Sequence, residues 1–314
     1  MRVRLMGSDQ RVVRAARVSF ARDELTDPER DKRLIRYLYT HRHASPFEHC
    51  VVAYEAPKDE WLRLLSEVES PTFQAYWTDG YLFLNLRNAL NALEKLPPEL
   101  VEQLRKAFPT VLGVAEGRSS DEELSSLPYS TDERFFLKKI ETPSGWVALV
   151  DKLELGTRMD YYTFIVECPL FVARQWMRHR FGSFNELSRR YVGDEQLSFY
   201  LPPYLRKQAK KNKQASVEEP VERSEELLKK VHAHAEESKK LYRELLNEGV
   251  ARELARGVLP LLTNTRFYWT VPRVSLDNFI TLRTHEGAQW EIRLLAEAVK
   301  KLAGYRGTDR ANRL

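Results

Sequence analysis

The sequence predicts a fold that mixes β-strands with α-helices. Two short runs rich in β-branched and aromatic residues, 51–57 and 162–168, indicate strands, and each run meets a proline at its end. A pattern of apolar residues at helical spacing follows each proline. With 314 residues, of which 43% are hydrophobic, the chain can bury a substantial core in one large or two ordinary domains.

The N-terminal half contains two further signals in chain order. Asp27-Pro28-Glu29 is a helix start, and the apolar residues after it predict a helix that ends near His41. The strand at 51–57 leads into a helical pattern at 59–68. Residues 113–134 are rich in Gly, Ser, Asp and Glu, and they predict a long surface loop.

The centre of the chain predicts a buried strand, 162–168, followed by a helix from Pro169 to about Arg180. Proline suits the first turn of a helix, because its missing N–H would have no partner there. Arg174 and Arg178 are four residues apart and are expected on one helix face. The opposite side is expected to pack through Leu170, Val172, Ala173, Trp176 and Met177.

The C-terminal part begins with a basic run, 206–213, and an acidic run, 218–226, which predict a solvated loop that leads into a helix. That helix should span about Glu222 to Asn247 and close at Gly249. An aromatic strand, 265–271, follows, and Arg283 is expected at the start of a last amphipathic helix.

Composition narrows the class of protein. The formal charge of +5 and the pI near 9 suit an anionic ligand, but 30% charged residues of both signs is not a nucleic-acid-binding composition. No run approaches the roughly 18 apolar residues of a membrane span, and the opening residues lack a signal peptide's apolar core. Cys50 and Cys168 are expected to be buried thiols in a reducing compartment, so the sequence predicts a cytoplasmic protein.

Five arginines and His179 lie between Arg174 and Arg190, against a single acid, Glu186. Composition alone would also fit a solvated basic face, but the arginines alternate with Trp176, Met177, Phe181 and Phe184. Arginines beside buried surface need anionic partners, and the planar guanidinium binds phosphate or carboxylate through two hydrogen bonds. Asn185, Glu186 and Ser188 add donors and acceptors for a base edge or a sugar hydroxyl.

These residues carry a resemblance. Arg178-His179-Arg180, then Ser188 after seven residues, then Arg190-Tyr191 resembles the signature of the flavin-dependent thymidylate synthases, and the flank at 171–180 is similar as well. The resemblance implies an α+β fold with a largely antiparallel sheet flanked by helices. It further implies methylation of dUMP to dTMP, with methylenetetrahydrofolate as carbon donor, FAD as redox relay and NADPH as electron source.

The resemblance also implies roles for individual residues. Arg283 would be catalytic, because a fixed guanidinium stabilises the negative charge that builds on the uracil ring. The residues expected to bind dUMP are Gln175, Arg178, Glu186, Ser188, Arg189, Arg190, Arg256 and Arg283. The residues expected to bind FAD are His43, Ser45, Glu48, Arg178, His179, Arg180, Glu186 and Asn278.

The chain departs from the family pattern at three places. Arg42 stands where the family usually has Gly, so a different local backbone is allowed there. Pro272-Arg273-Val274 replaces an Asn-x-Arg flavin contact. Gly287 stands where the family often has a histidine. These departures make a catalytically impaired, nucleotide-binding relative an alternative to the active enzyme.

The resemblance covers residues 1–56 and 159–314, and it leaves 57–158 as an insertion. The same order of features occurs twice in the chain: a strand, a proline, a helix, Tyr-Trp-Thr and then Leu-Arg. The segment from Tyr-Trp-Thr to Leu-Arg spans 76–87 in the first occurrence and 268–283 in the second. We therefore hypothesise that the insertion is a degenerate internal copy of the core, and that it is structural because it has no counterpart of Arg178-His179-Arg180; an unrelated helical insertion is the alternative. The family assembles its sites from several subunits, so a homo-oligomer, a tetramer, is expected.

Two other interpretations follow from the residues. His41, His43 and His49 with Cys50 suggest a metal site, but no further ligand stands at suitable spacing, and no metal is expected.

A nucleic-acid-binding protein would use the arginines of 174–190 and the lysines of 206–213 to contact phosphates. We expect neither a nucleic acid nor a membrane as partner. No glycine motif for a Rossmann or P-loop phosphate site occurs.

Overall fold

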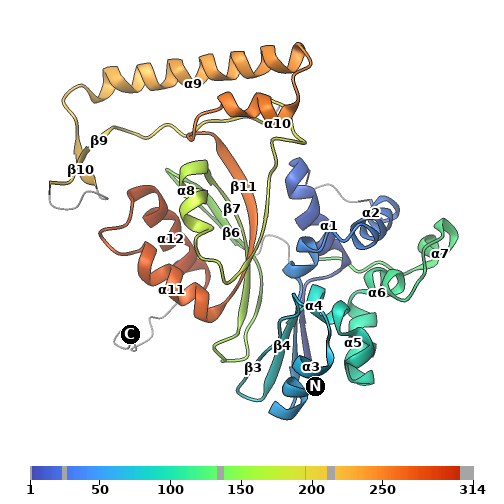
Figure 1. Ribbon diagram of the computed structural model, residues 1–314. Helices are drawn as coiled ribbons and strands as arrows, with labels where there is room; N and C mark the ends of the chain where they lie inside the picture. Colours follow the sequence, from blue (N-terminus) through green and yellow to red (C-terminus); the bar gives the residue numbers. More distant parts are fainter. Residues whose placement is uncertain (1, 23–26, 133–137, 195, 211–215, 305–314) are drawn as a thin grey trace.

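The computed structural model describes residues 2–22, 27–132, 138–194, 196–210 and 216–304. Among these residues, all strand pairs are antiparallel, and helices flank the two main sheets (Figure 1). The predicted α+β class with a largely antiparallel sheet is confirmed. No helix in this part of the chain is both long and apolar enough to cross a membrane.

The first sheet has the strand order β1-β2-β4-β3. A two-residue turn, Asp79-Gly80, joins β3 to β4, and both residues have positive φ angles, as this kind of hairpin turn requires. The strands are β1 (Val3–Met6), β2 (Val51–Glu55), β3 (Tyr76–Thr78) and β4 (Tyr81–Asn85). The surrounding helices are α1 (Asp9–Arg17), α2 (Pro28–Thr40), α3 (Lys58–Glu67), α4 (Leu86–Asn91), α5 (Pro98–Ala107), α6 (Pro109–Ala115) and α7 (Asp121–Ser126), with short 3-10 turns η1 (Val18–Phe20), η2 (Ser45–His49) and η3 (Leu93–Lys95).

The second sheet has the order β5-β6-β7-β11-β8, and helices α8, α11 and α12 pack on one of its faces (Figure 1). Trp176 and Trp269 are fully buried in this core, with rings 5.3 Å apart and perpendicular. The strands are β5 (Lys138–Thr142), β6 (Gly145–Leu153), β7 (Tyr161–Pro169), β8 (Ser183–Glu186) and β11 (Asn264–Pro272). The helices are α8 (Leu170–Trp176), α11 (Arg273–Arg283) and α12 (Trp290–Leu302).

The two sheets meet through apolar side chains of both. Met6, Val51 and Phe83 of the first sheet share a buried cluster with Leu153 and Tyr161 of the second. A second contact is made by α1 and η1, whose buried residues lie against Val150, Ile165 and Tyr268. The inner face of the second sheet is therefore covered by the N-terminal half of the chain.

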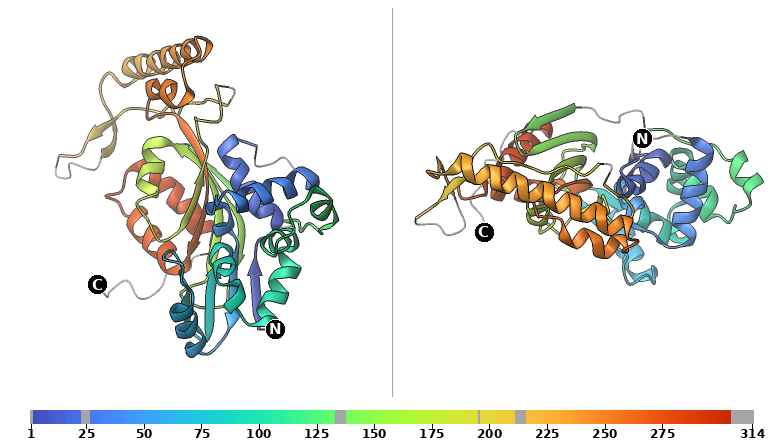
Figure 2. Two further views of the ribbon diagram at one scale, coloured as in Figure 1. Left: turned by 45° about the vertical axis from the view of Figure 1, so that its right-hand side comes forward. Right: turned by 90° about the horizontal axis from the view of Figure 1, so that it is seen from above.

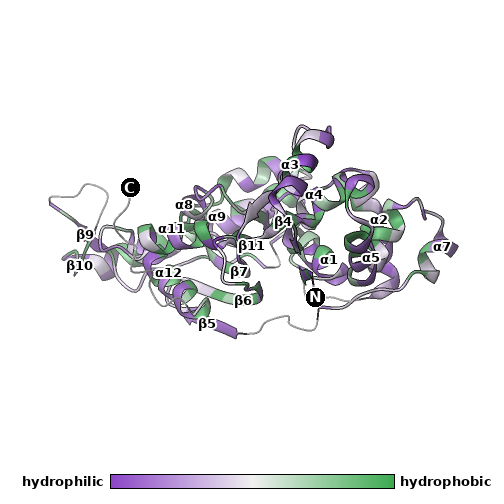
Figure 3. Ribbon diagram, turned by 90° about the horizontal axis from the view of Figure 1, so that it is seen from below, coloured by the Kyte–Doolittle hydropathy of each residue, from purple (hydrophilic) through white to green (hydrophobic). Residues whose placement is uncertain are grey.

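A third unit lies across one end of the molecule (Figure 2). It contains β9 (Arg206–Gln208), β10 (Ser216–Pro220), α9 (Ser224–Asn247), α10 (Arg252–Ala255) and the 3-10 turn η4 (Arg256–Val258). The predicted helix to Asn247 is confirmed, and Gly249 adopts a left-handed φ of 80° just beyond its end. Elsewhere, α2 and α5 show hydrophilic and hydrophobic residues side by side, as helices with one buried face should (Figure 3).

Three predictions about helices were wrong. The helix after Pro169 ends at Trp176 rather than near Arg180, because the chain must turn back there to pair β8 with β11. The predicted loop at 113–134 is not a long loop over its described part, 113–132, because α6 extends into it and Ser120 and Glu123 form a capping box that begins α7. Residues 133 and 134 lie outside the described residues. Arg283 lies at the end of α11 and not at the start of the last helix.

The basic run also differs from its prediction. Part of the expected loop forms the antiparallel pair β9 and β10, in which Lys207 contacts Glu219 at 3.2 Å, and Arg206 contacts Glu291 of α12 at 2.5 Å. These two cations of the run are thus paired with acids. Residues 211–213 of the run lie outside the described residues.

The two sheets share one strand arrangement. In chain order, β1, β2, α3, β3, β4 and α4 correspond to β6, β7, α8, β8, β11 and α11, and the strand orders β1-β2-β4-β3 and β6-β7-β11-β8 match. The two Tyr-Trp-Thr motifs, however, occupy different strands: the first forms β3, at a sheet edge, whereas the second lies within the central strand β11.

Candidate active site

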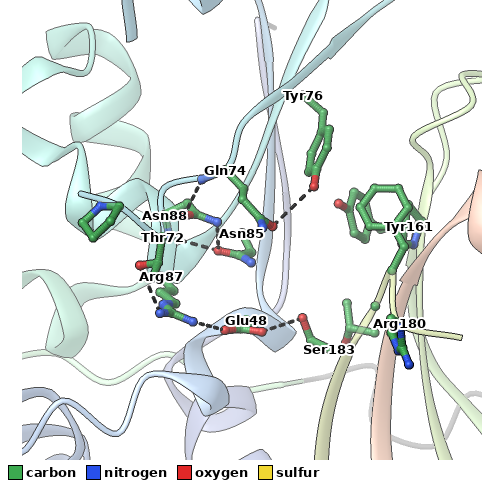
Figure 4. Close-up of a pocket in the computed structure, with 15 residues that line it drawn as sticks. Glu48, Thr72, Gln74, Tyr76, Asn85, Arg87, Asn88, Tyr161, Arg180 and Ser183 are labelled. Carbon is green, nitrogen blue, oxygen red and sulfur yellow. Dashed lines mark hydrogen bonds and ion pairs between the residues drawn. The ribbon is translucent and has the colours of Figure 1, made fainter. Parts of the chain in front are cut away.

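A polar pocket of about 440 Å³ opens between the two sheets (Figure 4). One side is formed by residues 71–88 of the predicted insertion, and the other by β7, β8, β11 and the segment before β8. Its size lies within the roughly 300–1,000 Å³ that is typical of small-molecule sites. The lining residues are Glu48, Pro71, Thr72, Gln74, Tyr76, Asn85, Arg87, Asn88, Tyr161, Arg180, Phe181, Gly182, Ser183, Thr270 and Pro272.

Glu48 connects the two sides of this pocket. One of its oxygens accepts a hydrogen bond from Nη1 of Arg87 at 2.6 Å, and the other accepts one from Oγ of Ser183 at 2.8 Å. Arg87 also donates to Thr72. A carboxylate fixed at both oxygens has a defined orientation, so Glu48 is held where it faces the space between the sheets.

Behind the pocket, His49 is fully buried among polar partners. Its Nδ1 lies 2.8 Å from Oγ1 of Thr270, and its Nε2 lies 3.2 Å from Oδ1 of Asn185. The Asn185 oxygen can only accept, so Nε2 carries the proton and Nδ1 accepts from Thr270. Burial lowers the pKa of His49 to about 3, so the ring is neutral at pH 7.

A second group of site residues gathers around Arg283. Its Nε donates to Nε2 of His179 at 3.0 Å, and its Nη2 donates to the backbone oxygen of Gln175 at 3.1 Å. Burial lowers the pKa of His179 to about 4, with the neighbouring Arg283 charge acting in the same direction. His179 is therefore neutral at pH 7, with its proton on Nδ1, and it orients the guanidinium as an acceptor.

A third group surrounds Glu186 on β8. Oγ1 of Thr265 donates to its carboxylate at 2.8 Å, and Arg174 and Arg256 lie near enough to favour its charged form. Burial is the stronger effect and raises the pKa of Glu186. Close by, Oγ of Ser188 lies 3.4 Å from Nε of Arg190, and no described histidine contacts this hydroxyl. Within the described ranges, Ser188 therefore has no base beside it that could activate it as a nucleophile.

The remaining site residues of the sequence analysis are scattered. Arg189 is buried, and its guanidinium donates to the backbone oxygens of Gly193 and Gln196, so it holds the loop after β8 together. Arg178, Arg180, His43, Ser45 and Asn278 have exposed side chains. Of the residues expected to bind FAD, only Glu48 and Arg180 line the pocket. No described contact joins the group around Arg283 to the group around Glu186.

Sequence reasoning missed most of the pocket wall. Gln74, Asn85, Arg87 and Asn88 belong to 57–158, which we expected to be structural. One signal could have found Asn85 and Arg87, because Asn85-Leu86-Arg87 has the Asn-x-Arg form that Pro272-Arg273-Val274 lacks. The three-histidine metal interpretation is not supported by the placement of His49, whose two ring nitrogens are already hydrogen bonded.

Comparison with known proteins decides the family. The family model described as "Thymidylate synthase complementing protein" matches residues 3–57 and 157–304. A protein of Aquifex aeolicus named flavin-dependent thymidylate synthase is 63% identical over 99% of both chains. The chain belongs to the flavin-dependent thymidylate synthase family. A relative with the same name from Thermotoga neapolitana is 31% identical over 96% of this chain and 82% of its own.

The family model passes over residues 58–156, whereas the Aquifex relative aligns through them. A solved structure with looser similarity is a UMP/dUMP methylase, PolB from Streptomyces cacaoi, bound with 5-Br dUMP. It is 24% identical, covers 96% of this chain and 89% of its own, and superposes with a TM-score of 0.41. Membership of the family confirms what the arginine motif indicated.

Proposed function

We propose that this chain methylates dUMP to dTMP in the cytoplasm, with methylenetetrahydrofolate as carbon donor, FAD as redox cofactor and NADPH as electron source. Family membership carries this proposal, together with the placement of Arg283. When bound, FAD would supply the two-electron chemistry that reduces the transferred carbon to a methyl group. The donor-rich pocket lined by Glu48 and Arg180 fits the carbonyl and ring-nitrogen acceptors of the flavin ring system.

Arg283 is the residue to which we assign catalysis. Nε and one Nη2 proton are engaged by His179 and Gln175, so the guanidinium is fixed while its Nη1 protons have no described partner. A fixed donor can stabilise negative charge on a uracil carbonyl at low reorganisation cost. Neutral His179 and the Gln175 carbonyl are positioning groups, because both accept from Arg283 and neither needs to touch dUMP.

Four of the residues proposed for dUMP belong to the group around Glu186: Glu186 itself, Arg256 near it, and Ser188 and Arg190 just after it in the chain. Arg174 and Arg256 lie near enough to Glu186 to act on its charge, Arg190 contacts Ser188, and all three arginines are exposed, as a phosphate site requires. Because this group and Arg283 share no described contact within one chain, we propose that a homo-oligomer, a tetramer, brings them together on one nucleotide. The division into a core, 1–56 and 159–314, and an insertion, 57–158, also remains our proposal, supported by the strand order the two sheets share.

Replacement of Arg283 by alanine tests the catalytic assignment. We expect the Arg283→Ala variant to fold and to bind FAD as the wild type does, because Arg283 does not line the pocket. Its turnover for dTMP formation should fall about 100-fold or more, since loss of one such donor costs about 3 kcal/mol. Arg223→Ala, at the exposed start of α9, is the matched control and should keep full turnover. Retained turnover in Arg283→Ala would remove the assignment.

A further inference from the structure

We propose that Asn85, at the corner between β4 and α4, donates hydrogen bonds to the isoalloxazine ring of FAD in the pocket between the two sheets. The inference rests on the proposed function, which brings a flavin to this chain. It gives the segment 57–158 a share in the cofactor site, in place of a purely structural role.

The fold places Asn85 opposite an equivalent corner. β4 and β11 occupy the same position in their two sheets, and each leads directly into a helix. Asn85 is the N-cap of α4, Pro272 is the N-cap of α11, and both line the pocket. Pro272 has no N–H and no polar side chain, so of these two corners only Asn85 can donate to a ligand.

The orientation of the Asn85 amide is determined by its neighbours. Its Oδ1 lies 2.9 Å from both the backbone N and the side-chain Nδ2 of Asn88, and both of these groups can only donate there. Oδ1 must therefore be the oxygen, and Nδ2 is directed elsewhere. Within the described part of the chain, Nδ2 has no acceptor. Two N–H donors are thus held in a fixed position at the wall of the pocket (Figure 4).

The neighbouring groups indicate what kind of ligand fits. Oε1 of Gln74 accepts from the Tyr76 hydroxyl at 3.3 Å, and its Nε2 has no partner among the described residues. The same is true of the Arg180 guanidinium, while both oxygens of Glu48 are already occupied. Gln74, Asn85 and Arg180 thus present N–H donors to the pocket that have no partner among the described residues.

Aromatic rings provide the second feature. The rings of Tyr76 and Phe181 lie 5.1 Å apart and bring aromatic surface to the pocket from both halves of the chain. A planar ring system whose edge carries carbonyl oxygens and unprotonated nitrogens would satisfy both the donors and the aromatic surface. The isoalloxazine ring has these properties.

The variant Asn85→Asp tests the inference with little change of shape. Aspartate keeps the oxygen that Asn88 needs and is as good an N-cap as asparagine, but it has no N–H to donate. Asn91→Asp adds the same charge at an exposed position of the same helix and is the matched control. We expect the affinity for FAD, measured by titration of flavin fluorescence, to fall about tenfold or more in Asn85→Asp. The control should stay within about twofold of the wild type, on the scale of surface substitutions.

The outcomes separate this inference from the proposed function. If the wild type bound no FAD, both would fail. If the wild type and Asn85→Asp bound FAD equally, the inference would be overturned while the proposed function stood. A loss of dUMP affinity with unchanged FAD affinity would also overturn it and assign the pocket to the nucleotide. Asn85→Ser, which keeps a capping oxygen but no amide, is a second variant if Asn85→Asp does not fold.

Discussion

His49 shows how a single residue makes the stability of this protein depend on pH. The ring is fully buried and bound by Thr270 and Asn185, and burial lowers its pKa from 6.5 to about 3. Between these two values the unfolded chain binds a proton at His49 that the folded chain does not. The free energy of unfolding should therefore fall as the pH drops from 6.5 toward 3, and His49 should contribute no pH dependence above 6.5.

We predict that His49→Gln removes this dependence. Glutamine can donate to Asn185 but does not titrate, so the variant should lose less stability on acidification than the wild type. The difference in slope between pH 4 and 6 should approach about 1.4 kcal/mol per pH unit, the value for one proton. Urea unfolding of both proteins at several pH values measures it. Asp9 and His179 are present in both proteins, so their titration cancels, and parallel slopes would contradict the prediction.

At the scale of elements, the end of α2 shows how the backbone accommodates Arg42, which stands where the family usually has glycine. The N–H groups of Arg42 and His43 donate to the carbonyls of Tyr39 and Leu38, in the arrangement of a Schellman motif. Arg42 has a φ of 56°, the left-handed conformation that glycine favours at this position. The backbone therefore keeps a glycine-like conformation although the residue is arginine.

We predict that Arg42→Gly stabilises the protein. A residue with a Cβ pays about 1 kcal/mol for the left-handed conformation, and glycine avoids most of this strain. The free energy of unfolding should rise by up to about 1 kcal/mol, which chemical denaturation can measure. Arg33→Gly, on the exposed face in the middle of the same helix, is the control and should lose about 1 kcal/mol. Equal effects of the two variants would refute the conformational argument.

Elements with strong local signals could be predicted from the sequence. The strand Asn264–Pro272 and the helix Ser224–Asn247 have long aromatic or helical patterns, and the structure confirms both. The helix after Pro169 was overextended, because its end depends on the pairing of β8 with β11, which lies far along the chain. The short helix Asp121–Ser126 was hidden by its loop-like composition, although its capping box was visible.

At the scale of the whole molecule, the pocket is shared between segments that the sequence keeps apart. Glu48 and Arg180 were predicted from the arginine motif and its family. Asn85 and Arg87 carry the Asn-x-Arg pattern, but the pattern does not place them opposite β11, because that position follows from the packing of one sheet against the other. The sequence also could not predict that Arg283 and the group around Glu186 share no described contact, because this depends on how the chain folds.

Conversion of dUMP by the purified protein decides whether this chain is an active enzyme. With FAD, NADPH and methylenetetrahydrofolate present, we predict that dTMP forms and that the C5 proton of dUMP is released in equal amount. Omission of FAD, after its removal from the protein, should stop both. A protein that binds FAD and dUMP but releases no C5 proton under these conditions would contradict the central claim that this chain is an active dUMP methyltransferase.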